Sequence, residues 1–248
     1  MTKEMVVVTG AGSGIGKEVV RRLTEKSIAV IAIGRRPEKL GEFGQAASEL
    51  ILPMAIDVSS RESVCSFAAQ VRARNISLKA LVNCAGIARS GELNLPLQQL
   101  EENWNAVIGT NLWGAYLMSA ASFPFLRKPG GRIINISSIA AYSGGQGSGS
   151  AIYAASKAGL HGLGAGLARE LSGHGITVNT IAPGYIGETG FSAGWSNERV
   201  AAILRDVPLH RAGTPGEIAG FVEYLLSDDG GFMTGEIVNI NGGWRFGS

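Results

Sequence analysis

The sequence has few charges, few aromatic residues and no long apolar run. Charged residues make up 17% of its 248 residues and the net charge is +2, so the composition does not indicate a nucleic-acid or membrane partner. No apolar stretch approaches the ~18 residues that a membrane-spanning helix needs. The first residues do not form a charged-then-apolar leader with a cleavage site, and we therefore expect a soluble, cytoplasmic protein.

Cysteine and histidine are also scarce. The two cysteines, Cys65 and Cys84, lie in apolar segments, so we expect buried free thiols in a reducing compartment. His174 and His210 have no partners at the spacing of a metal-binding motif. The sequence therefore predicts no metal site.

What the chain does have is a hydrophobic content of 45% and a regular alternation of apolar runs with helical patterns. This alternation is typical of α/β proteins that have a parallel sheet with helices on both faces. We find no linker, so we expect one domain over residues 1–248. The seven predicted strands are residues 5–9, 28–33, 51–56, 80–82, 132–136, 176–181 and 237–240.

Helical patterns separate these strands. At the start of the last helix, Thr214 and Glu217 have the spacing of a capping box. Residues 185–212 show no regular pattern, and we expect an irregular, mobile lid there. The predicted helices are residues 60–74, 102–126, 153–171 and 214–227, with shorter ones after Gly16 and at Pro37.

A glycine-rich loop follows the first strand. The pattern TGxxxGIG spans residues 9–16 and precedes a helix. Glycines at such a place let the backbone approach a pyrophosphate, which binds at the unpaired N–H groups of the helix N-terminus. The loop therefore predicts a dinucleotide site; the alternative is an ordinary glycine-rich turn.

The end of the second strand indicates which dinucleotide binds. An acidic residue there would bind the ribose 2′-hydroxyl of NAD and repel a 2′-phosphate. The chain instead has Gly34 followed by Arg35 and Arg36, and a guanidinium group suits a phosphate. We therefore predict NADP(H), with Arg35 as the main contact and Arg36 in support. The alternative is a pair of solvated arginines at the start of a helix.

Tyr153 and Lys157 lie four residues apart in a predicted helix and therefore share one of its faces. An ammonium group close to a phenol favours the phenolate and lowers the tyrosine pKa. The pair could therefore exchange a proton near neutral pH. By itself this spacing also occurs by chance on surface helices.

With these motifs in place, the chain resembles the short-chain dehydrogenase/reductase family, in its compact single-domain branch with a Rossmann fold. The resemblance extends over the whole chain, and it is similar to both 3-oxoacyl-acyl-carrier-protein reductases and carbonyl reductases. The motifs occur in the family's order: TGAGSGIG at 9–16, NCAG at 83–86, NLWG with Asn111, INISS at 134–138, YAASK at 153–157, APG at 182–184 and TGEIVNINGG at 234–243.

The resemblance implies a catalytic tetrad. Tyr153 would exchange a proton with the substrate oxygen, and Lys157 would lower the Tyr153 pKa and bind the nicotinamide ribose. Ser138, with Ser137 as its rival, would orient the substrate carbonyl. Asn111 would hold a water that links Lys157 to solvent.

The resemblance also implies a set of cofactor contacts. Asp57 and Val58 would flank the adenine, residues 83–86 would line the floor of the site, and residues 183–186 would meet the nicotinamide amide. Thr189 stands one position later than the family's usual threonine. The expected contacts are Gly10, Ser13, Gly14, Ile15, Gly16, Arg35, Arg36, Asp57, Val58, Asn83, Ala85, Gly86, Tyr153, Lys157, Pro183, Gly184, Ile186 and Thr189.

Two departures bear on the substrate. Cys84 replaces a usual asparagine, and the segment between Ser138 and Tyr153 is slightly long, with extra residues at 144–150. Phe191 and Trp195 are expected to form an apolar wall of the lid. We expect a ketone or secondary alcohol as the substrate of an NADP(H)-dependent oxidoreductase.

The close alternative is a 3-oxoacyl-acyl-carrier-protein reductase, with Arg127, Lys128 and Arg169 as docking residues for the acidic carrier protein. His174 stands at a position that is often basic in those enzymes. A remote alternative is a regulatory protein that binds the dinucleotide without catalysis. The resemblance also implies a homotetramer.

Overall fold

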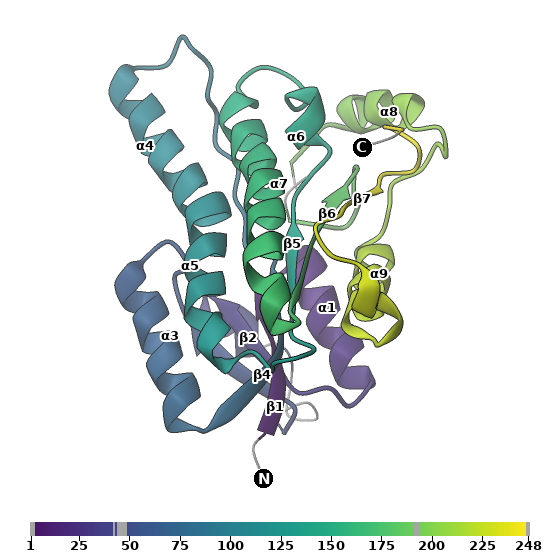
Figure 1. The fold of residues 1–248 in the computed structure, drawn as a ribbon. Helices are drawn as coiled ribbons and strands as arrows, with labels where there is room; N and C mark the ends of the chain where they lie inside the picture. The colour runs from purple at the N-terminus through teal and green to yellow at the C-terminus, as the bar shows by residue number, and fades with distance from the viewer. Residues whose placement is uncertain (1–2, 42, 44–48, 191–193, 247–248) are drawn as a thin grey trace.

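The seven strands form one parallel sheet in the order β3-β2-β1-β4-β5-β6-β7. The computed structural model describes residues 3–41, 43, 49–190 and 194–246. The predicted α/β fold with seven parallel strands is confirmed (Figure 1). The strands are β1 (Lys3–Thr9), β2 (Val30–Gly34), β3 (Ile51–Ala55), β4 (Ile76–Asn83), β5 (Arg132–Ile136), β6 (Thr177–Pro183) and β7 (Ile237–Ile240).

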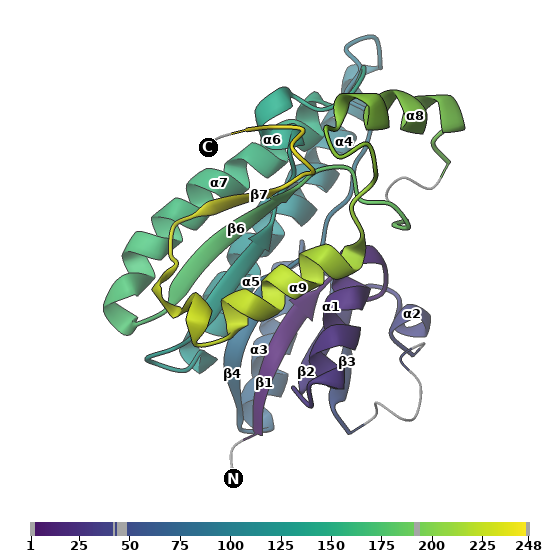
Figure 2. The same ribbon diagram turned by 90° about the vertical axis from the view of Figure 1, so that its right-hand side faces the viewer.

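Helices cover both faces of this sheet, as Figures 1 and 2 show. Side chains of a strand alternate between the two faces. In β1, Val6 and Val8 face one apolar core, and Met5 and Val7 face the other; all four are at most 1% exposed. The main helices are α1 (Gly14–Glu25), α2 (Pro37–Gly41), α3 (Arg61–Ala73), α4 (Leu97–Ile108), α5 (Gly114–Ser122), α6 (Ala140–Ser143), α7 (Ala151–Leu171), α8 (Asn197–Asp206) and α9 (Pro215–Leu226).

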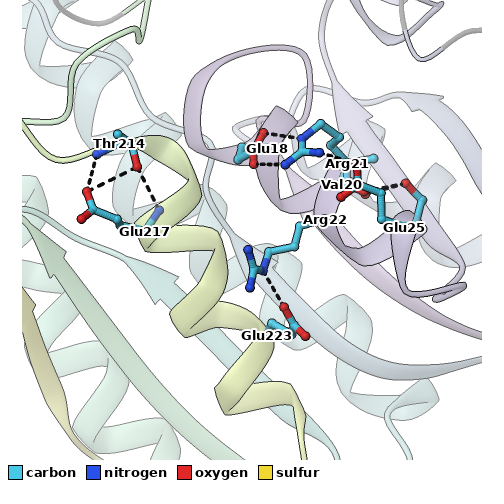
Figure 3. A network of polar contacts seen from close by, with 9 residues as sticks. Glu18, Val20, Arg21, Arg22, Glu25, Thr214, Glu217 and Glu223 are labelled. Carbon is cyan, nitrogen blue, oxygen red and sulfur yellow. Dashed lines mark hydrogen bonds and ion pairs between the residues drawn. The ribbon is translucent and has the colours of Figure 1, made fainter.

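Helix α9 is fixed at its start by the predicted capping box. The Glu217 carboxylate accepts a hydrogen bond from the Thr214 backbone N–H at 2.8 Å, and the Thr214 hydroxyl accepts one from the Glu217 N–H at 3.2 Å. Farther along, Arg22 of α1 forms an ion pair with Glu223 of α9 (Figure 3). The ion pair joins the last helix to the helix that follows the glycine loop.

Two expectations about regular structure were wrong. The predicted single helix over residues 102–126 begins earlier, at Leu97 after Pro96, and a π-helical segment interrupts it at Gly109–Trp113. Residues 185–212 are not wholly irregular, because they contain α8, whose first turn is capped by the Ser196 hydroxyl. A sequence signal for this helix was present, because Val200, Ile203, Leu204 and Val207 have helical spacing, and Ile203 and Val207 are buried.

The expectation of two buried thiols was half wrong. Both cysteines are free, but Cys65 is exposed and Cys84 is partly buried. Cys65 lies on α3, whose buried residues are Val64, Phe67 and Val71. Because these three side chains face the core, the side chain at position 65 of the same helix faces solvent.

The dense small residues of α7 have two different environments. A Cβ on Gly164 would lie 2.6 Å from the Thr180 hydroxyl, and one on Gly159 would lie 2.7 Å from Leu112. A Cβ on Gly162 or Gly166 would meet no described atom within 4 Å. Close approach of another backbone would explain such a helix, but the atoms nearest to Gly159 and Gly164 belong to side chains.

Candidate active site

The carboxyl end of β5 and the first turns of α7 bring three of the predicted residues together. Ser138 follows β5, and its hydroxyl is hydrogen bonded to the Tyr153 phenol. The Lys157 ammonium donates a hydrogen bond to the Ile136 carbonyl at 2.8 Å and lies 5.8 Å from the centroid of the Tyr153 ring. Lys157 is only 4% exposed. The helix spacing and the strand end thus place a phenol, a hydroxyl and an ammonium in one site.

Ser137, the rival of Ser138, points elsewhere. It is 4% exposed, and its hydroxyl donates a hydrogen bond to the Lys157 carbonyl at 2.9 Å. The same oxygen lies 2.9 Å from Nε2 of His161. Ser138 is therefore the serine that faces Tyr153.

Asn111 lies in the π-helical segment and joins the site from a third direction. Its Oδ1 accepts a hydrogen bond from the Ile87 N–H at 2.8 Å, and its Nδ2 donates to the Ile87 carbonyl at 2.9 Å and to the Ser156 hydroxyl at 2.9 Å. A Cβ on Gly86 would lie 3.3 Å from the Lys157 ammonium and 3.5 Å from Asn111 Oδ1. The amide therefore fixes the loop after β4 beside the lysine.

Burial sets the proton affinities of this pair. It raises the pKa of Tyr153 to about 12, although the Ser138 hydrogen bond acts in the opposite direction. Burial lowers the pKa of Lys157 to about 8. The expected depression of the tyrosine pKa by Lys157 is not found in the protein alone, where the loss of solvent around the phenol is the largest effect. At neutral pH the phenol holds its proton.

Cys84 is a further neighbour of the pair. Burial raises the pKa of its thiol to about 11, and the Lys157 cation partly opposes that rise. The thiol is therefore neutral near pH 7.

The glycine loop has the shape that a pyrophosphate needs. A Cβ on Gly10 would lie 2.9 Å from the Ala85 backbone, and one on Gly16 would lie 2.4 Å from the Gly10 carbonyl. Gly10 and Gly14 have positive φ angles of 68° and 51°. The first turn of α1 carries no acidic side chain, and within the described structure the Ser13 side chain makes no capping bond. Ile15 and Gly16 continue this turn, so the N–H groups of the helix start can receive an anion.

Thr9 is a residue that the list of expected contacts missed. Its hydroxyl accepts hydrogen bonds from the N–H groups of Cys84 and Ala85 at 3.0 and 3.1 Å. It thereby joins the ends of β1 and β4 directly under the cofactor loop. The sequence signal for this role was the position of Thr9 immediately before the first glycine of the loop.

The two arginines at the predicted 2′-phosphate site are exposed after the end of β2. Nearby, the Asp57 carboxylate accepts hydrogen bonds from the N–H and hydroxyl of Ser59 at 3.0 and 2.7 Å. Val58 is 5% exposed and packs against Gly114, so any cofactor contact at this position would come from its backbone. Arg35 and Arg36 follow Gly34, with no carboxylate at these three positions.

Asn83 supports the floor of the site instead of facing it. It is 4% exposed, and its amide donates a hydrogen bond to the Asn135 side chain at 3.0 Å. Ala85 and Gly86 follow it at the carboxyl end of β4. The Thr9 hydroxyl accepts the Ala85 N–H and Asn111 Oδ1 accepts the N–H of Ile87, so this loop is held at both of its ends.

The segment after β6 approaches the same loop. Gly184 donates its N–H to the Ile240 carbonyl at 2.9 Å, and the carbonyl of Pro183 accepts from Ile139 at 2.8 Å. Ile186 is buried. A Cβ on Gly14 would lie 3.4 Å from Thr189, which places Thr189 beside the glycine loop.

The segment predicted to form a lid contacts the long loop between Ser138 and Tyr153. Trp195 stacks on Tyr185 with their ring centroids 5.7 Å apart, and the Arg199 guanidinium lies 4.0 Å above the Trp195 ring. Arg199 also donates a hydrogen bond to the Gln146 carbonyl at 3.2 Å. A cavity of about 660 Å³ is lined there by Glu92, Gly145, Gln146, Gly147, Ser148 and Arg199. Phe191 lies outside the described residues.

The expected docking residues are not at this site. Arg127 forms an ion pair with Glu4 at the amino end of β1, and Lys128 lies 3.7 Å above the Phe123 ring. Arg169 is in the last turn of α7, whereas Tyr153 is in the first (Figure 1). These basic residues lie near the amino-terminal ends of the strands, opposite the site. The chain reaches that end of the sheet at the close of each helix, before the next strand begins.

In the part of the chain that the structure describes, no group of three or more histidine, cysteine, aspartate or glutamate side chains could hold a metal ion. Among those same residues, no helix is both long and apolar enough to cross a membrane.

The pKa of Lys157 predicts a pH-dependent stability. Between pH 8 and its ordinary value of 10.5, the unfolded chain binds more protons than the folded one at this residue, so its contribution to stability rises with pH. Tyr153 has the opposite effect on stability, but only above pH 10, because its pKa is 10 in the unfolded chain and about 12 in the folded protein. Urea unfolding should therefore show wild type gaining stability relative to Lys157→Met from pH 8 to 10. The matched control is Lys26→Met, at an exposed lysine, which should show no such change. Parallel plots of the free energy of unfolding against pH for wild type and Lys157→Met would contradict a buried ammonium.

Comparisons with known proteins agree with this geometry. A family model described as enoyl-(acyl carrier protein) reductase matches residues 10–245. The chain is 38% identical to the 3-oxoacyl-[acyl-carrier-protein] reductase FabG of Escherichia coli (strain K12) and 35% identical to that of Vibrio harveyi, covering 97% of this chain and 96% of each relative. It is also similar to the nodulation protein G of a Rhizobium species, at 33% identity over 98% of this chain and 97% of that one.

A solved structure is also similar over its whole length. The crystal structure of a short-chain dehydrogenase/reductase, a glucose/ribitol dehydrogenase from Brucella melitensis, has a TM-score of 0.84 and 28% identity, with 100% of both chains covered. The chain therefore belongs to the short-chain dehydrogenase/reductase family, whose members are oxidoreductases that act on CH–OH groups with a nicotinamide dinucleotide cofactor.

Proposed function

We propose that this protein is an NADP(H)-dependent 3-oxoacyl-[acyl-carrier-protein] reductase, which converts a 3-oxoacyl thioester into the 3-hydroxyacyl thioester. Relatives of that name match nearly the full chain at 35–38% identity. The observation that carries the proposal is the contact of a protonated Tyr153 with Ser138 beside the buried Lys157. This reading replaces the preference for a free ketone that the sequence alone suggested.

Each side chain has a distinct role in this proposal. Ser138 orients the substrate carbonyl, and the Tyr153 phenol donates its proton to the carbonyl oxygen as charge develops there. When bound, the nicotinamide supplies a hydride to the carbonyl carbon. In the reverse direction the tyrosine receives the hydroxyl proton of the alcohol.

Lys157 binds the nicotinamide ribose hydroxyls and stabilises the phenolate that remains after proton transfer. Its ammonium has three donors, and the Ile136 carbonyl occupies one of them. Asn111 keeps Gly86 beside this ammonium, and we propose that a water held by Asn111 returns the proton from solvent. The glycine loop, with its sterically required Gly10 and Gly16, holds the pyrophosphate.

A free ketone or secondary alcohol is the second candidate substrate. It is favoured by one observation: Arg127 and Lys128 lie far from the mouth of this chain's own site. An acidic carrier protein would instead meet Arg199, which is exposed at the contact between the lid and residues 144–150.

The homotetramer implied by the family resemblance stays a prediction. Five large apolar side chains are exposed on or just before α4, the π segment and α5, which is consistent with a subunit contact there. They are Leu93, Leu97, Trp104, Trp113 and Tyr116.

The cofactor assignment predicts a selective effect of Arg35→Ala. Loss of one charge-assisted contact to the 2′-phosphate, at about 1.5–3 kcal/mol, should raise the KM for NADPH roughly tenfold or more and leave the KM for NADH unchanged. Steady-state kinetics with both cofactors measures this. Arg74→Ala, at an exposed arginine at the end of α3, is the control and should change neither KM. Equal effects of Arg35→Ala on both cofactors would reject NADP(H) specificity.

The substrate assignment predicts an order of kcat/KM values. NADPH oxidation should be fastest with acetoacetyl-acyl-carrier protein, slower with acetoacetyl-coenzyme A, and slowest with a panel of free aliphatic and aromatic ketones. Arg199→Glu should reduce kcat/KM for the carrier-bound substrate alone, because it reverses the charge at the mouth. A free ketone with the highest kcat/KM would establish the second candidate instead.

A further inference from the structure

Behind the site, His161 lies one helical turn after Lys157 and makes a contact that the proposed reaction does not use. Its Nε2 is 2.9 Å from the Ser137 hydroxyl oxygen. Ser137 stands between Ile136, whose carbonyl binds the Lys157 ammonium, and Ser138, whose hydroxyl binds Tyr153. His161 therefore contacts Ser137, the residue between the one that binds Lys157 and the one that binds Tyr153.

The hydrogen-bond directions in this contact depend on the His161 tautomer, and the Lys157 carbonyl favours one of the two tautomers. The Ser137 hydroxyl has a single hydrogen, and it donates that hydrogen to the Lys157 carbonyl at 2.9 Å. With that hydrogen used, we infer that His161 is the donor, with a proton on Nε2. A histidine protonated only on Nδ1 would accept the serine hydrogen instead, and the Lys157 carbonyl would lose this partner.

The ring of His161 also contacts an aromatic side chain of α6. Tyr142 of α6 packs on it with the ring centroids 4.8 Å apart, and the Arg245 guanidinium lies 3.8 Å above the Tyr142 ring. Asn241 donates a hydrogen bond to the Arg245 carbonyl at 3.2 Å, which fixes this arginine's backbone. Burial, with a smaller effect of the Arg245 charge, lowers the pKa of His161, so the imidazole is neutral at pH 7.

We propose that His161 is a positioning residue: it directs the Ser137 hydroxyl onto the Lys157 carbonyl and so sets Ser138 at its distance from Tyr153. Three hydrogen bonds then join β5's end to α7, from Lys157 to Ile136, from Ser137 to Lys157 and from Ser138 to Tyr153. The inference rests on the proposed roles of Ser138, Tyr153 and Lys157. Without the histidine donor the serine hydroxyl can rotate among its staggered positions, and the second of these bonds is no longer enforced.

Four variants test this role. His161→Leu keeps the volume and removes the donor, His161→Gln restores an N–H at a similar reach, Ser137→Ala removes the acceptor, and the fourth combines Ser137→Ala with His161→Leu. We expect His161→Leu and Ser137→Ala each to lower kcat with the acetoacetyl thioester roughly tenfold, because small misplacements at a reacting centre are costly. The Kd for NADPH, measured by its fluorescence, should not change.

The remaining variants separate positioning from packing. His161→Gln should recover most of kcat, and the double variant should be no slower than either single one, because both remove the same contact. Wild-type kcat in His161→Leu, no recovery in His161→Gln, or multiplied losses in the double variant would each overturn the proposal. If His161→Leu fails to fold, wild-type kcat in Ser137→Ala overturns it alone.

A second measurement does not depend on turnover. Long-range ¹H–¹⁵N NMR of the imidazole in the full chain reports which nitrogen carries the proton. We expect the Nε2–H form at His161, with a chemical shift that changes in Ser137→Ala; an Nδ1–H form would overturn the inference. A wild-type protein that reduces neither thioester nor ketone would reject the proposed function, while the NMR result would still decide the hydrogen-bond direction.

Discussion

A single buried ammonium group organises the active edge of this protein. Lys157 is 4% exposed, and burial lowers its pKa to about 8, so the site disfavours its charged form relative to water. The carbonyl of Ile136 stabilises it from the strand, and the loop after β4 approaches it closely, since a Cβ on Gly86 would lie 3.3 Å from the ammonium nitrogen. The strand, the loop and the helix therefore meet at the ammonium group of Lys157.

The same burial determines the state of the tyrosine. A phenol with a pKa of about 12 is a proton donor at neutral pH, ready for the reducing direction. In our proposal the bound cofactor and the lysine together stabilise the phenolate once the proton has left. Proton transfer then depends on the presence of the cofactor, which couples it to the hydride step without a separate switch.

The sequence predicted the sheet, the glycine loop and the capping box of α9, because each depends on local periodicity or on a few residues at fixed spacing. It also placed Tyr153 beside Lys157 through their helical spacing, whereas Ser138 joined them only through the family resemblance. It missed the π-helical segment that carries Asn111, for which no sequence pattern exists. It also missed the direction of the Tyr153 pKa and the position of Arg127, because solvent exclusion and the return path of the chain follow from tertiary packing.

The most direct test of the account follows the transferred atoms. NADPH deuterated at the reactive C4 position is incubated with an acetoacetyl thioester and either wild type or Tyr153→Phe, and the product is examined by mass spectrometry. We predict one deuterium at C3 of the 3-hydroxyacyl product for wild type, and no product for Tyr153→Phe, although that variant binds NADPH with an unchanged Kd. Deuterated product formed by Tyr153→Phe at the wild-type rate would contradict the role of the tyrosine as proton donor.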